Sequence, residues 1–303
     1  MHKISIQTTK IFEAFGIDDG FRIIHEAGFD GVDFTLIPFA PQSAIRSGES
    51  CVFSKTDDEI KEFFRPYKEA AEKYAVEFSQ AHAPVQSLQK TPEACRYMIE
   101  VLKKSIIVCD YLNCPHLVVH PFFFGYDDQL DPKTEWDANI SGYSQLIPAM
   151  KKHHVTVCLE NMFGSYRGKI YAASCQTPAE ANLYIDTLNE IAGEKCFAFC
   201  YDTGHSNLIG RDIYTIIRQL GHRIECLHIH DNDGWSDQHL APYMGCADWN
   251  RFIGGMREIG YDGVLNFESH GVISTFDHEV IPAALKLTAE TGKMFSHRIL
   301  SGQ

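Results

Sequence analysis

The chain has 303 residues, of which 45% are hydrophobic and 22% charged, as is ordinary for a globular protein with a large core. Its formal net charge is -13 and it has no basic stripe, which argues against nucleic acid and anionic membranes as partners. Its ten cysteines form no CxxC pair, and it has no apolar leader or run of membrane-span length, so we expect a reduced, cytoplasmic protein.

Short β-rich runs alternate with longer helical patterns along the chain, in eight units. The expected strands are residues 4–7, 31–36, 77–82, 116–120, 156–160, 197–202, 225–230 and 264–268. The expected helices are residues 17–27, 57–75, 92–112, 137–152, 178–192, 212–220, 248–259 and 278–293. Because this alternation implies a parallel sheet and eight units favour its closure, we predict an α/β fold, a single (β/α)8 TIM barrel domain over residues 1–303.

Several helix boundaries carry local signals. Thr91 and Thr177 each place a capping hydroxyl before a proline of the first helical turn, and Asp248 precedes a further helical pattern. Gly28 and Gly260 follow helical patterns and are expected to adopt the left-handed conformation that ends a helix. No GxGxxG or GxxxxGK[ST] motif follows the first strand, which argues against the usual nucleotide-binding folds.

The chemistry of a (β/α)8 barrel lies at the C-terminal ends of its strands. Strands three to eight end in, or are soon followed by, imidazoles and carboxylates: His82, His120, Glu160, Asp202, His205, His228, His230, Asp231, Asp237, His239 and Glu268. A single histidine of this kind is more often a hydrogen-bonded core residue, but six strands in register are not explained that way. Neutral imidazole and carboxylate suit divalent ions such as Zn²⁺ or Mn²⁺, so the pattern predicts a metal site.

Taken together, these segments resemble the xylose isomerase-like barrels, a superfamily that includes ketose 3-epimerases, inosose dehydratases and the endonuclease IV class of repair enzymes. The resemblance covers nearly the whole chain. The matching pieces are His82-Ala-Pro, Val-Val-His120-Pro, Leu-Glu160-Asn, Tyr-Asp202-Thr-Gly-His205, Leu-His228-Ile-His230-Asp231, Asp237-Gln-His239, Gly-Tyr-Asp-Gly and Phe-Glu268. The set is specific for the superfamily but not for one activity, because the fold hosts many chemistries.

The resemblance implies a set of metal ligands for one to three ions. The four ligands shared by the epimerases and the endonucleases match Glu160, Asp202, His228 and Glu268. A second endonuclease-type position matches His82, His120 and the bridging Glu160, and a third matches His205, Asp237 and His239. On the seventh strand we prefer His228 to His230 as the ligand, although strand alternation places both on one face.

The function that the resemblance implies first is a divalent-metal-dependent isomerase or epimerase of a sugar or polyol, phosphorylated or not. Glu160 and Glu268 would act as the catalytic carboxylates that move a proton through a metal-stabilised enediolate, and His205 would orient the substrate or hold a second ion. The ketose 3-epimerases carry a substrate-binding arginine where this chain has Gly234-Trp235, and an acidic residue near the position of Tyr166. A free ketohexose therefore fits this sequence less well than another sugar.

Other functions stay open. Clustered ions would also suit a lyase or hydrolase of a sugar-containing substrate, although the acidic charge opposes DNA repair. A non-catalytic subunit that keeps the site for structure is the third alternative. Aromatic side chains near the expected barrel mouth could stack on a substrate, as in C-glycoside cleavage, or pack between subunits of a homo-oligomer: Phe122, Phe123, Phe124, Tyr126, Trp235 and Tyr243. Arg167 and Lys169 could hold a phosphate or carboxylate, but solvated loop charges explain them better.

Overall fold

The computed structural model of the chain describes residues 1–84, 91–122 and 131–302. Its main sheet has eight strands in the order β10-β1-β2-β3-β4-β5-β8-β9. β1 pairs in parallel with β10 and β2, and β4 pairs in parallel with β3 and β5. An isolated parallel bridge between Ile229 and Phe267 links the segments of β9 and β10, the two strands at the ends of that order. The eight parallel strands with their helices form a (β/α)8 TIM barrel, which confirms the predicted fold class.

The bounds of the elements follow the predicted alternation. The main strands are β1 (Ile4–Gln7), β2 (Gly31–Thr35), β3 (Glu77–His82), β4 (His116–Val118), β5 (Thr156–Glu160), β8 (Phe197–Asp202), β9 (Ile224–His228) and β10 (Leu265–Phe267). The α-helices are α1 (Ile11–Phe15), α2 (Ile17–Ala27), α3 (Gln42–Ser47), α4 (Asp57–Tyr74), α5 (Pro92–Tyr111), α6 (Pro132–Ser144), α7 (Ile147–His153), α8 (Pro178–Ala192), α9 (Thr203–Leu208), α10 (Ile213–Leu220), α11 (Trp249–Glu258), α12 (Gly271–Thr275) and α13 (Ile281–Ser301). Among the described residues, the short 3₁₀ helices are η1 (Ile37–Phe39), η2 (Val52–Ser54) and η3 (Gly221–Arg223). A separate antiparallel pair consists of β6 (Phe163–Tyr166) and β7 (Lys169–Ala172).

Several elements depart from the predicted ones: α13 runs to Ser301 where the prediction ended at residue 293, and short helices such as α3 and α9 were not predicted. The single helix predicted over residues 137–152 is wrong, because α6 and α7 divide this region and Pro148 lies in the first turn of α7. A proline lacks the N–H that would continue a preceding helix but fits the start of a new one. The β6–β7 hairpin was not predicted; Arg167 and Gly168 at its turn have φ values of 49° and 76°, as a tight hairpin turn requires.

The caps that the sequence predicted at Thr91, Thr177, Asp248 and Gly28 are confirmed. The Thr91 side chain accepts a hydrogen bond from the Ala94 N–H, and the Asp248 carboxylate accepts from two N–H groups of α11. Thr177 caps α8 in the same way. Gly28, the C-cap of α2, has the left-handed φ of 96°. These caps fix where each helix begins or ends, and thereby where the neighbouring strand starts.

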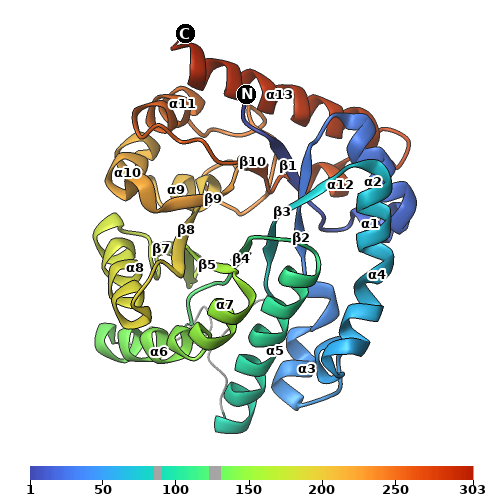
Figure 1. The fold of residues 1–303 in the computed structure, drawn as a ribbon. Coiled ribbons are helices and arrows are strands. Elements are labelled where there is room, and N and C mark those ends of the chain that lie inside the picture. The colour runs from blue at the N-terminus through green and yellow to red at the C-terminus, as the bar shows by residue number, and fades with distance from the viewer. Residues whose placement is uncertain (85–90, 123–130, 303) are drawn as a thin grey trace. The chain divides into compact units, whose positions relative to one another are not determined.

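The residues fall into two compact units, and the boundaries between them pass through β2, α4, β3 and β8. The first unit comprises Met1–Phe34, Tyr67–Ser79 and Cys200–Gln303. In it the two ends of the chain lie side by side, with β1, in blue, next to β10, in orange (Figure 1). The Phe267 ring of β10 stacks on Phe295 of α13, and the Phe295 ring also stacks on Trp249 at 5.4 Å. Phe267 directly precedes Glu268, so this aromatic core anchors the strand that carries one of the candidate ligands.

The second unit comprises Thr35–Pro66 and Gln80–Phe199. Its aromatic contacts include Trp136 stacked on Tyr184 at 4.4 Å and Phe122 against Tyr143 at 5.1 Å. The prediction of one domain over residues 1–303 stays a prediction. Among the helices of the described residues, none combines the length and the apolar character that crossing a membrane would need.

Candidate metal centre

Asp202 organises the candidate ligands of the first unit. It is the last residue of β8 and the N-cap of α9, where its Oδ1 accepts a hydrogen bond of 2.7 Å from the His205 N–H. This cap fixes His205 in the first turn of α9, with its Nδ1 3.7 Å from Asp202 Oδ2. The spacing Asp-x-x-His therefore places both predicted residues together because a helix starts where the strand ends.

The two histidines at the end of β9 have different neighbours. His228 Nδ1 lies 3.3 Å from Glu268 Oε2 and 3.9 Å from Asp202 Oδ2. His230 Nε2 lies 3.0 Å from Asp202, and the donor atoms of Asp202, His205 and His230 lie within 4.8 Å of one another. His230, which the ligand set from the resemblance leaves out, thus belongs to the same cluster. Both imidazoles are completely buried.

The loop after β9 brings Asp237 and His239 to this cluster. His239 Nε2 lies 3.0 Å from Asp237 Oδ2, and its Nδ1 lies 3.6 Å from Glu268 Oε2. Asp237 Oδ2 is also 3.6 Å from His205 Nε2. The predicted trio of His205, Asp237 and His239 is therefore close together, and His230, His239 and Glu268 form another group with donor atoms within 4.8 Å.

Buried side chains hold this loop and the end of β10. Asp231 accepts hydrogen bonds at Oδ1 from the N–H groups of Asn232 and Ala247, and at Oδ2 from the Tyr243 N–H and the Trp249 indole. It thereby ties both ends of the loop to one carboxylate. At the end of β10, Glu268 Oε1 accepts a hydrogen bond from the side-chain amide of Gln7, which fixes the orientation of this glutamate.

The ionisable side chains of the cluster shift one another's pKa values. Burial opposes ionisation of Asp237, but hydrogen bonds from His205 and His239 hold its pKa well below the usual value. Burial also lowers the pKa of His239, but the carboxylates of Glu268 and Asp237 outweigh it and raise the pKa to about 9. Without metal, the His239 imidazole is therefore protonated on both nitrogens near neutral pH, and a cation that binds there would have to displace one of these protons.

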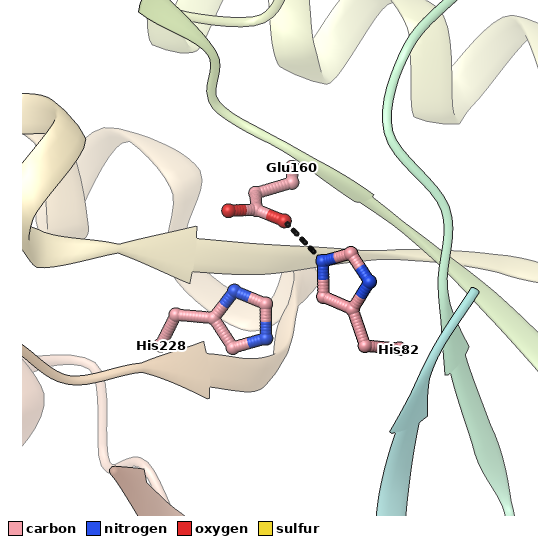
Figure 2. A group of neighbouring side chains, drawn as sticks. All are labelled: His82, Glu160 and His228. Atoms are coloured by element: carbon pink, nitrogen blue, oxygen red, sulfur yellow. Dashed lines mark ion pairs between the residues drawn. The ribbon is translucent and has the colours of Figure 1, made fainter. Parts of the chain in front are cut away.

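A second set of candidate ligands lies in the other unit, at the ends of β3, β4 and β5. His82 Nε2 and His120 Nε2 are 3.1 Å apart, and each faces Glu160 Oε2, at 3.8 and 3.1 Å respectively. Figure 2 shows the His82 imidazole pointing toward the Glu160 carboxylate; His228, also labelled there, belongs to the first unit. His82 Nδ1 lies 2.7 Å from the Ala83 carbonyl oxygen, which favours a proton on Nδ1 and leaves the Nε2 lone pair to face Glu160. The predicted trio of His82, His120 and Glu160 is thus close together.

The donor set fits a divalent cation. Asp237 Oδ1, which lies 3.9 Å from His230 Nε2 in the cluster, is buried and lacks a hydrogen-bond partner within the described part of the chain. Unsatisfied buried polar atoms cost about 1–3 kcal/mol each, and a cation removes that cost where it coordinates them. Buried nitrogen and oxygen donors facing common points are the ligands of Zn²⁺ or Mn²⁺. A metal-binding cluster of histidine and carboxylate side chains is therefore present, and its ion remains to be identified.

The predicted aromatic side chains differ in their placement. Trp235 and Tyr243 are exposed, at 83% and 55%, on the loop after β9. Phe122 is 1% exposed and packs against Tyr143, so it is not available to a substrate. Phe123, Phe124 and Tyr126 lie outside the described residues. Arg167 lies at the turn of the β6–β7 hairpin, with its guanidinium over the Tyr166 ring, and Lys169 begins β7.

Comparison with known proteins agrees with the fold. The family described as xylose isomerase-like TIM barrel matches residues 21–290. The chain is similar to D-allulose 3-epimerase of Methylomonas sp. in complex with D-allulose, with 14% identity, a TM-score of 0.72 and coverage of 97% of this chain and 98% of that chain. It is also similar to 3-keto-D-glucoside 4-epimerase of E. coli, with 15% identity, a TM-score of 0.72 and coverage of 97% and 100%. A zinc-bound IOLI protein matches with 15% identity, a TM-score of 0.67 and coverage of 99% and 98%.

Proposed function

The chain belongs to the xylose isomerase-like TIM barrel family, and we propose on that basis that it is a divalent-metal-dependent isomerase or epimerase of a sugar or polyol. One observation carries the proposal: the gathering of buried imidazoles and carboxylates at strand ends, with donor atoms within 4.8 Å of one another in the first unit. Such a cluster is expensive to bury without a cation. The mouth of a barrel is also where this fold binds its substrates.

We assign the principal ion to Glu160, Asp202, His228 and Glu268, the four positions implied by the family resemblance. His82 and His120 with Glu160, and His205 with Asp237 and His239, would hold up to two further ions. Zn²⁺ and Mn²⁺ fit these donors, and a similar structure, the IOLI protein, contains zinc. The close approach of the members of each trio supports the additional positions.

The proposed mechanism is proton transfer at a carbon beside a carbonyl group. A bound divalent ion would supply positive charge that stabilises the developing oxyanion. Glu160 or Glu268 would remove the proton and the other would return it, at a gain of about 10²–10⁴-fold for each general acid–base step. Gln7 donates to Glu268 Oε1 and thereby fixes the orientation of this carboxylate, while His205 would orient a substrate hydroxyl.

The similar structures favour a small polyhydroxy substrate. One contains D-allulose and another is an epimerase of a 3-keto-glucoside. In this chain Gly234-Trp235 stands where the ketose 3-epimerases carry their substrate-binding arginine, and Trp235 is exposed, two positions before Asp237 in the sequence. A sugar bearing an apolar or aromatic substituent therefore fits better than a simple free ketohexose. We propose a soluble sugar derivative, with or without phosphate, as the substrate class.

A second candidate is a metal-dependent lyase or hydrolase of a sugar-containing substrate. The observation that favours it is the closeness of both additional trios, because clustered ions suit cleavage of phosphoester or glycosidic bonds. The net charge of -13 opposes a DNA substrate.

The test is a screen of ketoses, inososes, keto-glycosides and their phosphates in deuterated water, with protein loaded with Zn²⁺ or Mn²⁺. The isomerase proposal predicts deuterium at one carbon of at least one substrate, detected by mass spectrometry and NMR. Glu268→Gln should abolish this exchange while the circular dichroism spectrum is unchanged, because the amide cannot accept the proton. Release of a leaving group from the sugar would instead support the lyase or hydrolase, and near-normal exchange by Glu268→Gln would refute the catalytic role of that residue.

A further inference from the structure

A chain of buried polar side chains connects β1, β2 and β10 with His228 on β9. Asp33 Oδ2 lies 3.0 Å from His228 Nε2 and accepts a hydrogen bond of 3.1 Å from Asn266 Nδ2. Asn266 Oδ1 accepts one of 2.7 Å from Ser5 Oγ, and its Nδ2 also donates to the Leu227 carbonyl at 3.1 Å. The side chains of Ser5, Asp33, His228 and Asn266 are all completely buried.

The partners of Asn266 fix which of its atoms faces Asp33. Its oxygen faces the Ser5 hydroxyl, whereas its nitrogen faces the Leu227 carbonyl, which can only accept. The amide therefore directs its second N–H at Asp33, whose carboxylate lies between this donor and the His228 ring. A carboxylate so placed accepts hydrogen bonds on both sides, which requires a hydrogen on His228 Nε2.

The other nitrogen of the His228 ring faces the cluster. Its Nδ1 lies 3.3 Å from Glu268 Oε2 and 3.9 Å from Asp202 Oδ2. In a neutral imidazole only one nitrogen carries a hydrogen, so a hydrogen on Nε2 leaves the Nδ1 lone pair for a cation. A carboxylate behind a ligating imidazole also increases its basicity as a ligand.

We infer that Asp33 is a positioning residue, which holds His228 in the tautomer that binds the divalent ion through Nδ1. The inference rests on the proposed function, because it concerns the same ion. Asp33 was absent from the ligands that the sequence predicted, and its carboxylate contacts the Nε2 side of the His228 ring, opposite the Nδ1 that faces Glu268. Its action is therefore on the affinity of the site for metal, through His228.

The test compares metal affinity in Asp33→Asn and in a matched control, Asp30→Asn. Asp30 precedes β2 and its carboxylate accepts from the Ile4 N–H, away from the cluster. Binding of Zn²⁺ is measured by competition with a chromophoric chelator, and folding by circular dichroism and thermal unfolding of the metal-free proteins. We expect affinity to fall about 10–100-fold in Asp33→Asn and to stay within about 2-fold of wild type in the control.

Two failures are distinguishable in this design. A wild-type protein that takes up no divalent ion contradicts the proposed function. A folded Asp33→Asn that binds Zn²⁺ as tightly as wild type overturns the role of Asp33 alone. If Asp33→Asn does not fold, NMR of zinc-loaded wild type with ¹⁵N-labelled histidine decides, after assignment of His228 with His228→Gln. Coordination through Nδ1 with a protected hydrogen on Nε2 supports the inference, and coordination through Nε2 overturns it.

Discussion

Asp231→Asn should loosen the loop that carries Asp237 and His239. The Asp231 carboxylate accepts four hydrogen bonds, two at each oxygen. An asparagine replaces one oxygen by a donor, so two of the four donors lose their acceptor whichever way the amide turns. Hydrogen bonds to a charged group are worth about 1.5–3 kcal/mol each, which sets the loss at about 3–6 kcal/mol before relaxation. Tyr243, with a φ of 72°, is one of the donors and would relax first.

The assay is urea unfolding of the metal-free protein, followed by titration with Zn²⁺. We expect the free energy of unfolding to fall by about 3 kcal/mol or more, and zinc affinity to fall with it. The control is Asp233→Asn on the same loop, an exposed carboxylate that accepts from the N–H groups of Trp235 and Ser236 and should matter little. An unfolding free energy within about 1 kcal/mol of wild type would refute the reasoning for Asp231.

Further predictions concern the second unit. Burial raises the pKa of Glu180 to about 7, with a further contribution from the charge of Glu135. Because the folded state therefore holds this proton more tightly than the unfolded state, Glu180 favours the folded state at pH 5 and loses that contribution as the pH rises toward 8. The stability of Glu180→Gln relative to wild type should therefore increase between pH 5 and pH 8. We expect an increase on the order of 1–2 kcal/mol, because the side chain is partly exposed. Urea unfolding at the two pH values measures it, and no increase would contradict the prediction. Gly142→Ala would place a Cβ 2.5 Å from the Phe122 ring and should lower stability by about 1–3 kcal/mol, and an unchanged melting temperature would show that the ring moves freely.

The sequence predicted the barrel because its signals are local and repeated. Strand runs such as residues 4–7 and 156–160 coincide with β1 and β5, and caps such as Thr177 determine helix starts. The split of residues 137–152 was missed because the apolar pattern continues through the break, and only Pro148 marks it. The short β6–β7 hairpin was missed because its strands are half-exposed and give no clear alternation.

The candidate ligands were predictable in type but not in all their contacts. The proximity of His205 to Asp202 follows from a helix that starts at a strand end. The role of His230 could not be separated from that of His228, because alternate residues of a strand share a face. Asp33 was missed for another reason: a lone carboxylate in a buried strand gives no sign of its partner, His228, which lies 195 positions away in the sequence. That Glu160 binds the same ion as Asp202, His228 and Glu268 remains a prediction.

The most direct test is the metal content of the protein as purified, measured by inductively coupled plasma mass spectrometry and followed by anomalous diffraction at the absorption edge of the metal found. The account predicts between one and three equivalents of Zn²⁺ or Mn²⁺, with one ion bound by Glu160, Asp202, His228 and Glu268. Protein that contains no divalent ion, and takes up none on dialysis against Zn²⁺ or Mn²⁺, would contradict it.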